Sequence, residues 1–123
     1  MVWFTFNNLK DNIYIYEFTE NCIDDELINY FEHYQNLITT SNNKISIIFN
    51  LKNIKNINTK QLWRNIQFIN NLKDIHREKL KNFVLIFEGT FIQNITDMVF
   101  IFSPPVVPYL ITDSIDNAIR YLE

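Results

Sequence analysis

The sequence predicts an α/β fold in which helices lie mainly on one face of a mixed β-sheet. Short apolar or alternating runs typical of strands recur between longer segments whose apolar residues return every three to four positions. The first two strand-like runs follow each other closely, which is typical of an antiparallel hairpin. With 123 residues, 47% of them hydrophobic, the chain fits one domain, residues 1–123, with one core.

The expected N-terminal hairpin pairs a strand over residues 2–7 with one over residues 13–18, joined by residues 9–12. Side chains alternate between the two faces of a strand, yet both faces of this hairpin carry large apolar or aromatic side chains. We therefore predict a contact with a second copy of the chain, which makes a homodimer, through aromatic residues of this hairpin: Trp3, Tyr14, Tyr16 and Phe18. The alternative is that one of the two C-terminal helices of the same chain covers this face.

A helix and a strand follow the hairpin. Apolar residues recur at helical spacing over residues 23–38, and Asn21 is the expected cap of this helix. Three acidic residues fall in its first turn, where the helix dipole favours negative charge: Asp24, Asp25 and Glu26. Residues 44–51 are predicted to form the third strand.

The middle of the chain predicts one long helix over residues 58–80, with Asn58 as its cap and Gln61 completing a capping box. Trp63 lies outside the inward apolar stripe of this helix, and we expect a neighbouring helix to cover it. Residues 82–88 are apolar throughout, as in a strand that is buried on both faces, and we expect this strand to be the most central.

The C-terminal third predicts a helix, a strand and a last helix. Helical spacing from Ile92 to Phe102 favours a helix that ends before Pro104, although a strand over residues 98–102 is an alternative. The strand over residues 106–112 contains Pro108 and belongs at a sheet edge. Ser114 is then the expected cap of the last helix. The complete predicted order is β-β-α-β-α-β-α-β-α, with right-handed crossovers.

Composition indicates a soluble cytoplasmic protein. No apolar run approaches the length of about 20 residues that a membrane-spanning helix needs, and the N-terminus does not resemble a secretory signal. The high content of asparagine and isoleucine is typical of an AT-rich genome, viral genomes included. This bias concerns origin rather than chemistry.

The sequence does not indicate an enzyme, and we expect no cofactor or metal. The single cysteine, Cys22, forms no internal disulfide and is more typical of a partly buried thiol than of a nucleophile. His33 and His76 lie on predicted helices without a catalytic or metal-binding motif around them. The only glycine, Gly89, does not provide a glycine-rich phosphate loop.

Charge is distributed unevenly along the chain. Residues 44–81 carry nine Lys and Arg against two acidic residues, whereas the remainder carries two basic residues against twelve acidic ones. Four of the basic residues cluster near the start of the long helix: Lys52, Lys55, Lys60 and Arg64. Such a cluster is able to contact nucleic acid or an anionic membrane, but the sequence contains no nucleic-acid recognition motif. We therefore expect a protein partner with an acidic surface rather than nucleic acid.

The segments "IIFNLKNIKNINTKQLW" and "ITDSIDNAIRYLE" resemble parts of the STAS domain, the fold of anti-sigma-factor antagonists and of the cytoplasmic tails of sulfate transporters. The segment "IIFNLKNIKNINTKQLW" stands where that family has an apolar strand, a loop of the form D-L-x-x-V-x-x-I-D and a helix start. The segment "ITDSIDNAIRYLE" resembles the closing strand and the S-x-x-x-A-x-x-x-L helix of the family. The similarity covers nearly the whole chain and implies a single STAS-like layer that binds protein partners.

The loop departs from the family pattern at the positions of the phosphorylation switch. Asn50 and Asn58 replace two aspartates, and Lys60 replaces the serine that the family phosphorylates. Lysine cannot carry a phosphate ester, and its charge is opposite to that of phosphoserine. Thr59 matches the first of the family's two serines and is an alternative acceptor, although a threonine beside a helix cap more often serves backbone hydrogen bonds.

The sequence thus predicts a non-catalytic interaction module that acts as a regulatory or assembly subunit. Its predicted contact residues lie in the loop and at the start of the long helix: Lys52, Lys55, Asn58, Thr59, Lys60 and Arg64. Two alternatives remain open. One is a structural protein of a virion or another large complex, and the other is a carrier of a small apolar ligand or lipid.

Overall fold

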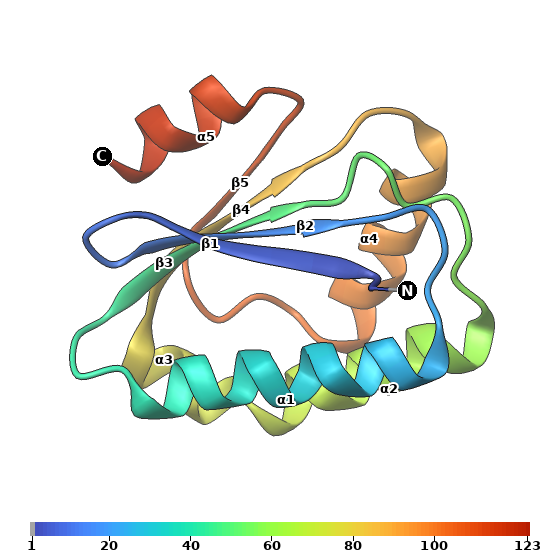
Figure 1. The fold of residues 1–123 in the computed structure, drawn as a ribbon, viewed down its shortest axis with the longest axis horizontal. Coiled ribbons are helices and arrows are strands. Elements are labelled where there is room, and N and C mark those ends of the chain that lie inside the picture. The colour runs from blue at the N-terminus through green and yellow to red at the C-terminus, as the bar shows by residue number, and fades with distance from the viewer. Residues whose placement is uncertain (1) are drawn as a thin grey trace.

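Five strands and five helices follow one another along residues 2–123, the part of the chain that this computed structural model describes (Figure 1). In chain order they are β1 (Phe4–Lys10), β2 (Ile13–Phe18), α1 (Asp24–Thr40), β3 (Ile45–Asn50), α2 (Thr59–Asn71), α3 (Lys73–Lys79), β4 (Leu80–Ile86), α4 (Thr90–Phe102), β5 (Tyr109–Thr112) and α5 (Ile115–Leu122). The predicted order is confirmed, except that the long helix is divided into α2 and α3.

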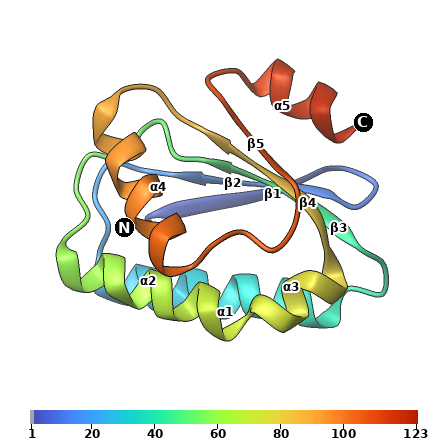
Figure 2. The ribbon, with the colours of Figure 1, turned by 180° about the vertical axis from the view of Figure 1, so that it is seen from behind.

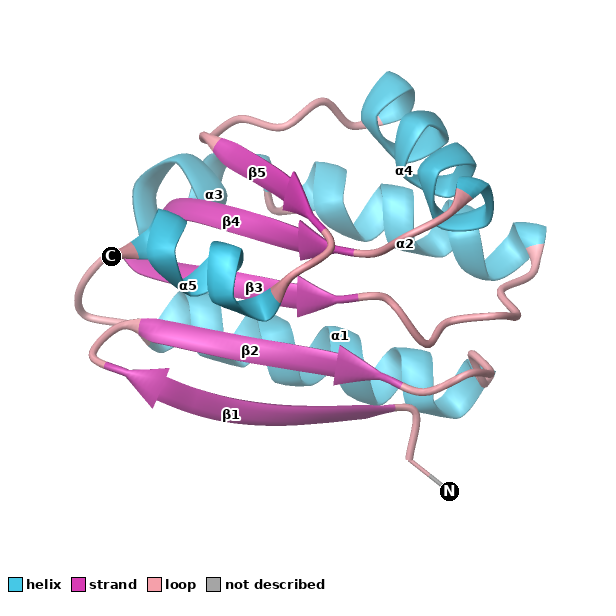
Figure 3. Cartoon of the chain, turned by 90° about the horizontal axis from the view of Figure 1, so that it is seen from above, coloured by secondary structure: helices cyan, strands magenta, loops and turns pink. Residues whose placement is uncertain are grey.

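The strands form one mixed sheet in the order β1-β2-β3-β4-β5 (Figure 3). β1 and β2 pair antiparallel through a turn in which Asn12 takes a positive φ of 59°, and the other neighbours pair in parallel. Asparagine is one of the few residues other than glycine that adopts this conformation readily. The central strand is β3 rather than the predicted β4, although both are apolar because both are covered on two faces.

Helices α1 to α4 lie on one side of the sheet and only α5 lies on the other, as the sequence predicts (Figures 1 and 3). α5 is amphipathic and packs Ala118 and Leu122 on an aliphatic patch formed by Ile13, Ile15, Ile48, Val84 and Ile86. The larger, aromatic core lies on the side of α1 to α4.

The predicted self-association surface of the hairpin is wrong. Trp3, Tyr16 and Phe18 are buried, Tyr14 is half-buried, and all four pack within the main core of the same chain. The covering helix is α1, whose Tyr30 contacts the rings of Trp3, Tyr16 and Phe18, and neither C-terminal helix takes this role. Strand alternation does not specify which helix lies on a given face of the hairpin.

Several element boundaries also differ from the predicted ones. Asn21 does not cap α1, because its side chain accepts a hydrogen bond from Asn56 and Ile23 occupies the cap position without a side-chain cap. The long helix is interrupted at Leu72, whose backbone N–H bonds to the carbonyls of Ile69 and Asn70 (Figure 2). β1 extends to Lys10, beyond the predicted end at residue 7. The capping hydroxyl of Ser114, the helix that ends at Phe102 and the edge position of β5 are confirmed.

Candidate functional site

The candidate site begins where β3 ends and the chain crosses to α2. Backbone hydrogen bonds hold this loop to its neighbours: the N–H of Leu51 donates to Ile86 at 2.8 Å, and those of Lys55 and Asn56 donate to the carbonyl of Glu20 at 2.8 and 2.9 Å. Cys22 returns a bond to the carbonyl of Asn56 at 3.0 Å. The loop is therefore fixed at both ends, with Ile54 as its buried anchor.

A complete capping box fixes the start of α2, as the sequence predicts. The side-chain oxygen of Asn58 accepts the N–H of Gln61 at 2.8 Å, and the side-chain oxygen of Gln61 accepts the N–H of Asn58 at 2.9 Å. The amide nitrogen of Gln61 also donates to the carbonyl of Cys22 at 3.1 Å and to the carboxylate of Asp24 at 3.0 Å. Gln61 thus connects the starts of α1 and α2.

The predicted contact residues lie together on the surface around this helix start. Lys52, Lys55, Asn58, Thr59 and Lys60 are exposed, and Arg64 is half-buried. Two of the four cations have acidic neighbours: the amino group of Lys52 lies 3.5 Å from Glu88, and that of Lys55 lies 3.3 Å from Glu20. Lys60 and Arg64 form no ion pair with any of residues 2–123, so they carry the uncompensated positive charge of the site.

Exposed apolar side chains adjoin the same helix start. The rings of Trp63 and Phe102 meet edge to face with centroids 4.6 Å apart, and Met98 and Ile101 lie on neighbouring turns of α4. Ile101 is 73% exposed, the largest value among the large apolar side chains of the described residues. We call Trp63, Met98, Ile101 and Phe102 the α2–α4 patch. The sequence singled out Trp63 but not the patch, because the approach of α4 to α2 is a tertiary feature.

The residues weighed for catalysis lie in environments that suit packing. Burial, with a smaller contribution from Asp24, raises the pKa of the Cys22 thiol to about 12, so this thiol is protonated at neutral pH. His33 and His76 are hydrogen-bonded to the hydroxyls of Tyr16 and Tyr34, at 2.7 and 2.9 Å. Among residues 2–123 no group of three or more His, Cys, Asp or Glu side chains is arranged to hold a metal ion.

No helix within residues 2–123 is both long and apolar enough to cross a membrane. Such a helix needs about 20 consecutive apolar residues.

Comparison with known proteins identifies the fold. No protein-family model matches the chain, and no curated protein matches it either. A similar solved structure is that of an uncharacterized protein of the DUF3478 family, with a SpoIIAA-like fold, from Shewanella loihica PV-4. The TM-score is 0.69 over 98% of this chain and 92% of the other, with 11% sequence identity. The chain therefore has a SpoIIAA-like fold, which confirms the STAS-like fold expected from the sequence.

Proposed function

We propose that the chain is a non-catalytic interaction module of the cytoplasm, a regulatory or assembly subunit that binds an acidic protein partner through the β3–α2 loop and the start of α2. The observation that carries this proposal is the combination of a rigid helix start with outward-facing functional groups. The capping box and the bonds of Gln61 fix the backbone, while Asn58, Thr59 and Lys60 remain exposed. A surface fixed before contact loses little conformational freedom on binding.

The two cations that are unpaired within residues 2–123 restrict the proposed contact surface to one face of α2. Lys60 and Arg64 are one turn apart on the helix, and Trp63 is exposed three positions after Lys60, at neighbouring-turn spacing from it. Tryptophan and arginine are the side chains most often found at the energetic centre of protein interfaces. Lys52 and Lys55 contribute less, because their charges are already paired with Glu88 and Glu20.

The α2–α4 patch supplies an apolar surface beside these charges. An apolar centre with a charged rim is typical of protein–protein contacts, whereas nucleic-acid sites are dominated by positive charge. A fixed lysine at position 60 gives permanent attraction to an acidic surface, in contrast to a site whose charge is switched by phosphorylation. A building block of a larger complex would use the same surface but would copurify in a stable assembly.

The test is affinity purification from the cells that express the protein. It compares the wild-type chain with two full-length charge-reversal variants. The Lys60→Glu/Arg64→Glu variant should lose the partner, and association with the purified partner should slow roughly tenfold at low salt, because charge complementarity mainly raises the rate of encounter. The matched control is Lys44→Glu/Lys81→Glu, which changes the net charge by the same amount. Both lysines lie near the first residues of the parallel strands β3 and β4, at the end of the sheet opposite to the β3–α2 loop. Equal binding by all three forms would refute this interface.

A further inference from the structure

An apolar cavity of about 180 Å³ lies between the sheet and helices α1 to α4. Aromatic rings from distant parts of the chain form much of its wall, among them Trp3, Tyr30, Phe49, Phe68, Phe83 and Phe100. The connection from α4 to β5 closes one side, because Pro104 and Pro105 end the helix and carry the chain across the gap.

Half-exposed lining residues mark the opening of this cavity. Asn65 and Ile69 of α2 and Val106 of the α4–β5 connection belong to the wall and are all partly accessible, so the cavity is not fully enclosed. Lys73, which is exposed, is the only permanently charged residue of the wall. The interior therefore disfavours a charged occupant, because a charge without a partner is expensive to bury.

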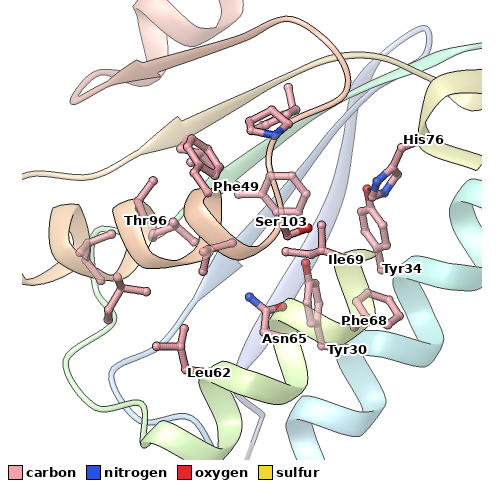
Figure 4. A pocket seen from close by; sticks show the side chains of 18 of the residues that line it. Tyr30, Tyr34, Phe49, Leu62, Asn65, Phe68, Ile69, His76, Thr96 and Ser103 are labelled. Carbon is pink, nitrogen blue, oxygen red and sulfur yellow. The ribbon is translucent and has the colours of Figure 1, made fainter. Parts of the chain in front are cut away.

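The side chains of Ser103 and Tyr30 bring hydroxyl groups into the apolar interior. Ser103 is 3% exposed and Tyr30 is 8% exposed, and both side chains extend toward the middle of the cavity (Figure 4). Hydrogen bonds hold the hydroxyls of Tyr16 and Tyr34 on His33 and His76, whereas that of Tyr30 has no such partner within residues 2–123. Burial raises the pKa of Tyr30 well above its usual value, so its phenol keeps the proton and is able to donate it.

The size and lining restrict what occupies the cavity. An apolar cavity of roughly 150 Å³ is large enough for benzene and stays free of water, because water needs two to four polar partners. Rings in the wall favour an aromatic guest through edge-to-face contacts. A hydroxyl that faces the cavity is able to donate a hydrogen bond to a guest, so a guest that accepts this bond is preferred over one that does not.

We propose that this cavity binds a small uncharged aromatic molecule with one hydrogen-bond acceptor, which the hydroxyls of Tyr30 and Ser103 hold. The indole nitrogen of Trp3 is buried without a hydrogen-bond partner in the described chain, but it has almost no accessible surface. We therefore assign the polar contact to the two hydroxyls. This site is distinct from the proposed protein contact, which uses the outer side of α2, whereas the cavity uses its inner side.

Calorimetric titration of the full chain with three probes tests the proposal. Acetophenone presents a ring and one carbonyl acceptor, ethylbenzene has nearly the same shape without the acceptor, and octanoate carries a negative charge. We expect acetophenone to bind more tightly than ethylbenzene and octanoate. Tyr30→Phe and Ser103→Ala keep the cavity open, and each should weaken acetophenone roughly three- to tenfold, the effect of one neutral hydrogen bond, without weakening ethylbenzene.

A pair of substitutions on α4 distinguishes binding of the probes in the cavity from binding elsewhere on the surface. Val99→Phe places a ring in the cavity and should abolish binding of both uncharged probes, whereas Asn94→Phe adds a ring on the exposed side of the same helix and should leave binding unchanged. Thermal unfolding without probe verifies that each variant is folded. Failure of acetophenone to bind the wild type, tighter binding of octanoate, or no effect of either hydroxyl substitution would overturn the proposal.

Discussion

Both histidines of the chain are hydrogen-bonded to tyrosine hydroxyls in the aromatic core. The hydroxyl of Tyr34 lies 2.9 Å from Nε2 of His76, and that of Tyr16 lies 2.7 Å from Nδ1 of His33. The helical pattern of the sequence places His76 on a helix but does not show that it is buried, because the partner, Tyr34, lies 42 positions earlier in the chain. Residue pairs of this separation follow from helix packing and not from local spacing.

The buried pair predicts a pH-dependent stability. Burial lowers the pKa of His76 to about 4, whereas an unfolded histidine has a pKa near 6.5. Between these values the unfolded chain binds more protons than the folded one. The contribution of His76 to the stability of the folded chain is therefore fully present above about pH 6.5 and is lost as the pH decreases toward 4. The contribution of this residue between pH 7 and pH 5 is about 2 kcal/mol.

Urea unfolding at pH 7 and pH 5 measures this effect. His76→Gln keeps a hydrogen-bond partner for Tyr34 but does not titrate, so its stability should change much less between the two pH values. His33→Gln is the matched control, because His33 is only half-buried, and this variant should retain most of the wild-type dependence. The same loss of stability in wild type and His76→Gln would show that another group is responsible.

At the scale of elements, the start of α2 was predictable and its end was not. Asn58 and Gln61 have the spacing of a capping box, and the structure contains both of its hydrogen bonds. The interruption at Leu72 was missed because the helical pattern continues through it into α3. The adjacent pair Asn70 and Asn71 is the local signal, since asparagine favours turns over helix interiors.

The capping box leads to a prediction for stability. Asn58→Ala removes the side-chain acceptor of the Gln61 N–H and should lower the free energy of unfolding by about 1 kcal/mol. Asn58→Asp keeps the acceptor and should retain most of the stability. Thr59→Ala, a change at the next exposed position, should shift the free energy of unfolding by less than about 0.5 kcal/mol. Chemical denaturation compares the three, and a loss in Asn58→Asp as large as in Asn58→Ala would contradict the role of the cap.

At the scale of the whole molecule, the fold was predictable because local patterns and connection rules agree. Alternating strands and helices joined by crossovers leave few topologies for a single mixed sheet. The cavity was not predictable, since it depends on how far α4 and the residues after Pro105 stand from β3 and β4. Similarly, the sequence located the basic cluster but not the partners of Lys52 and Lys55, which come from distant segments.

The central claim, that the start of α2 is the surface that contacts a protein partner, is tested most directly by photo-crosslinking. Two variants of the full chain are produced in the cells that express it. One carries a photo-crosslinking amino acid in place of Lys60, at the start of α2, and the other carries it in place of Lys81, near the start of β4. Both side chains are exposed, so both variants should fold. We expect a discrete crosslinked species of higher mass at position 60 and none at position 81. The same species at both positions, or a species at position 81 alone, would contradict the central claim.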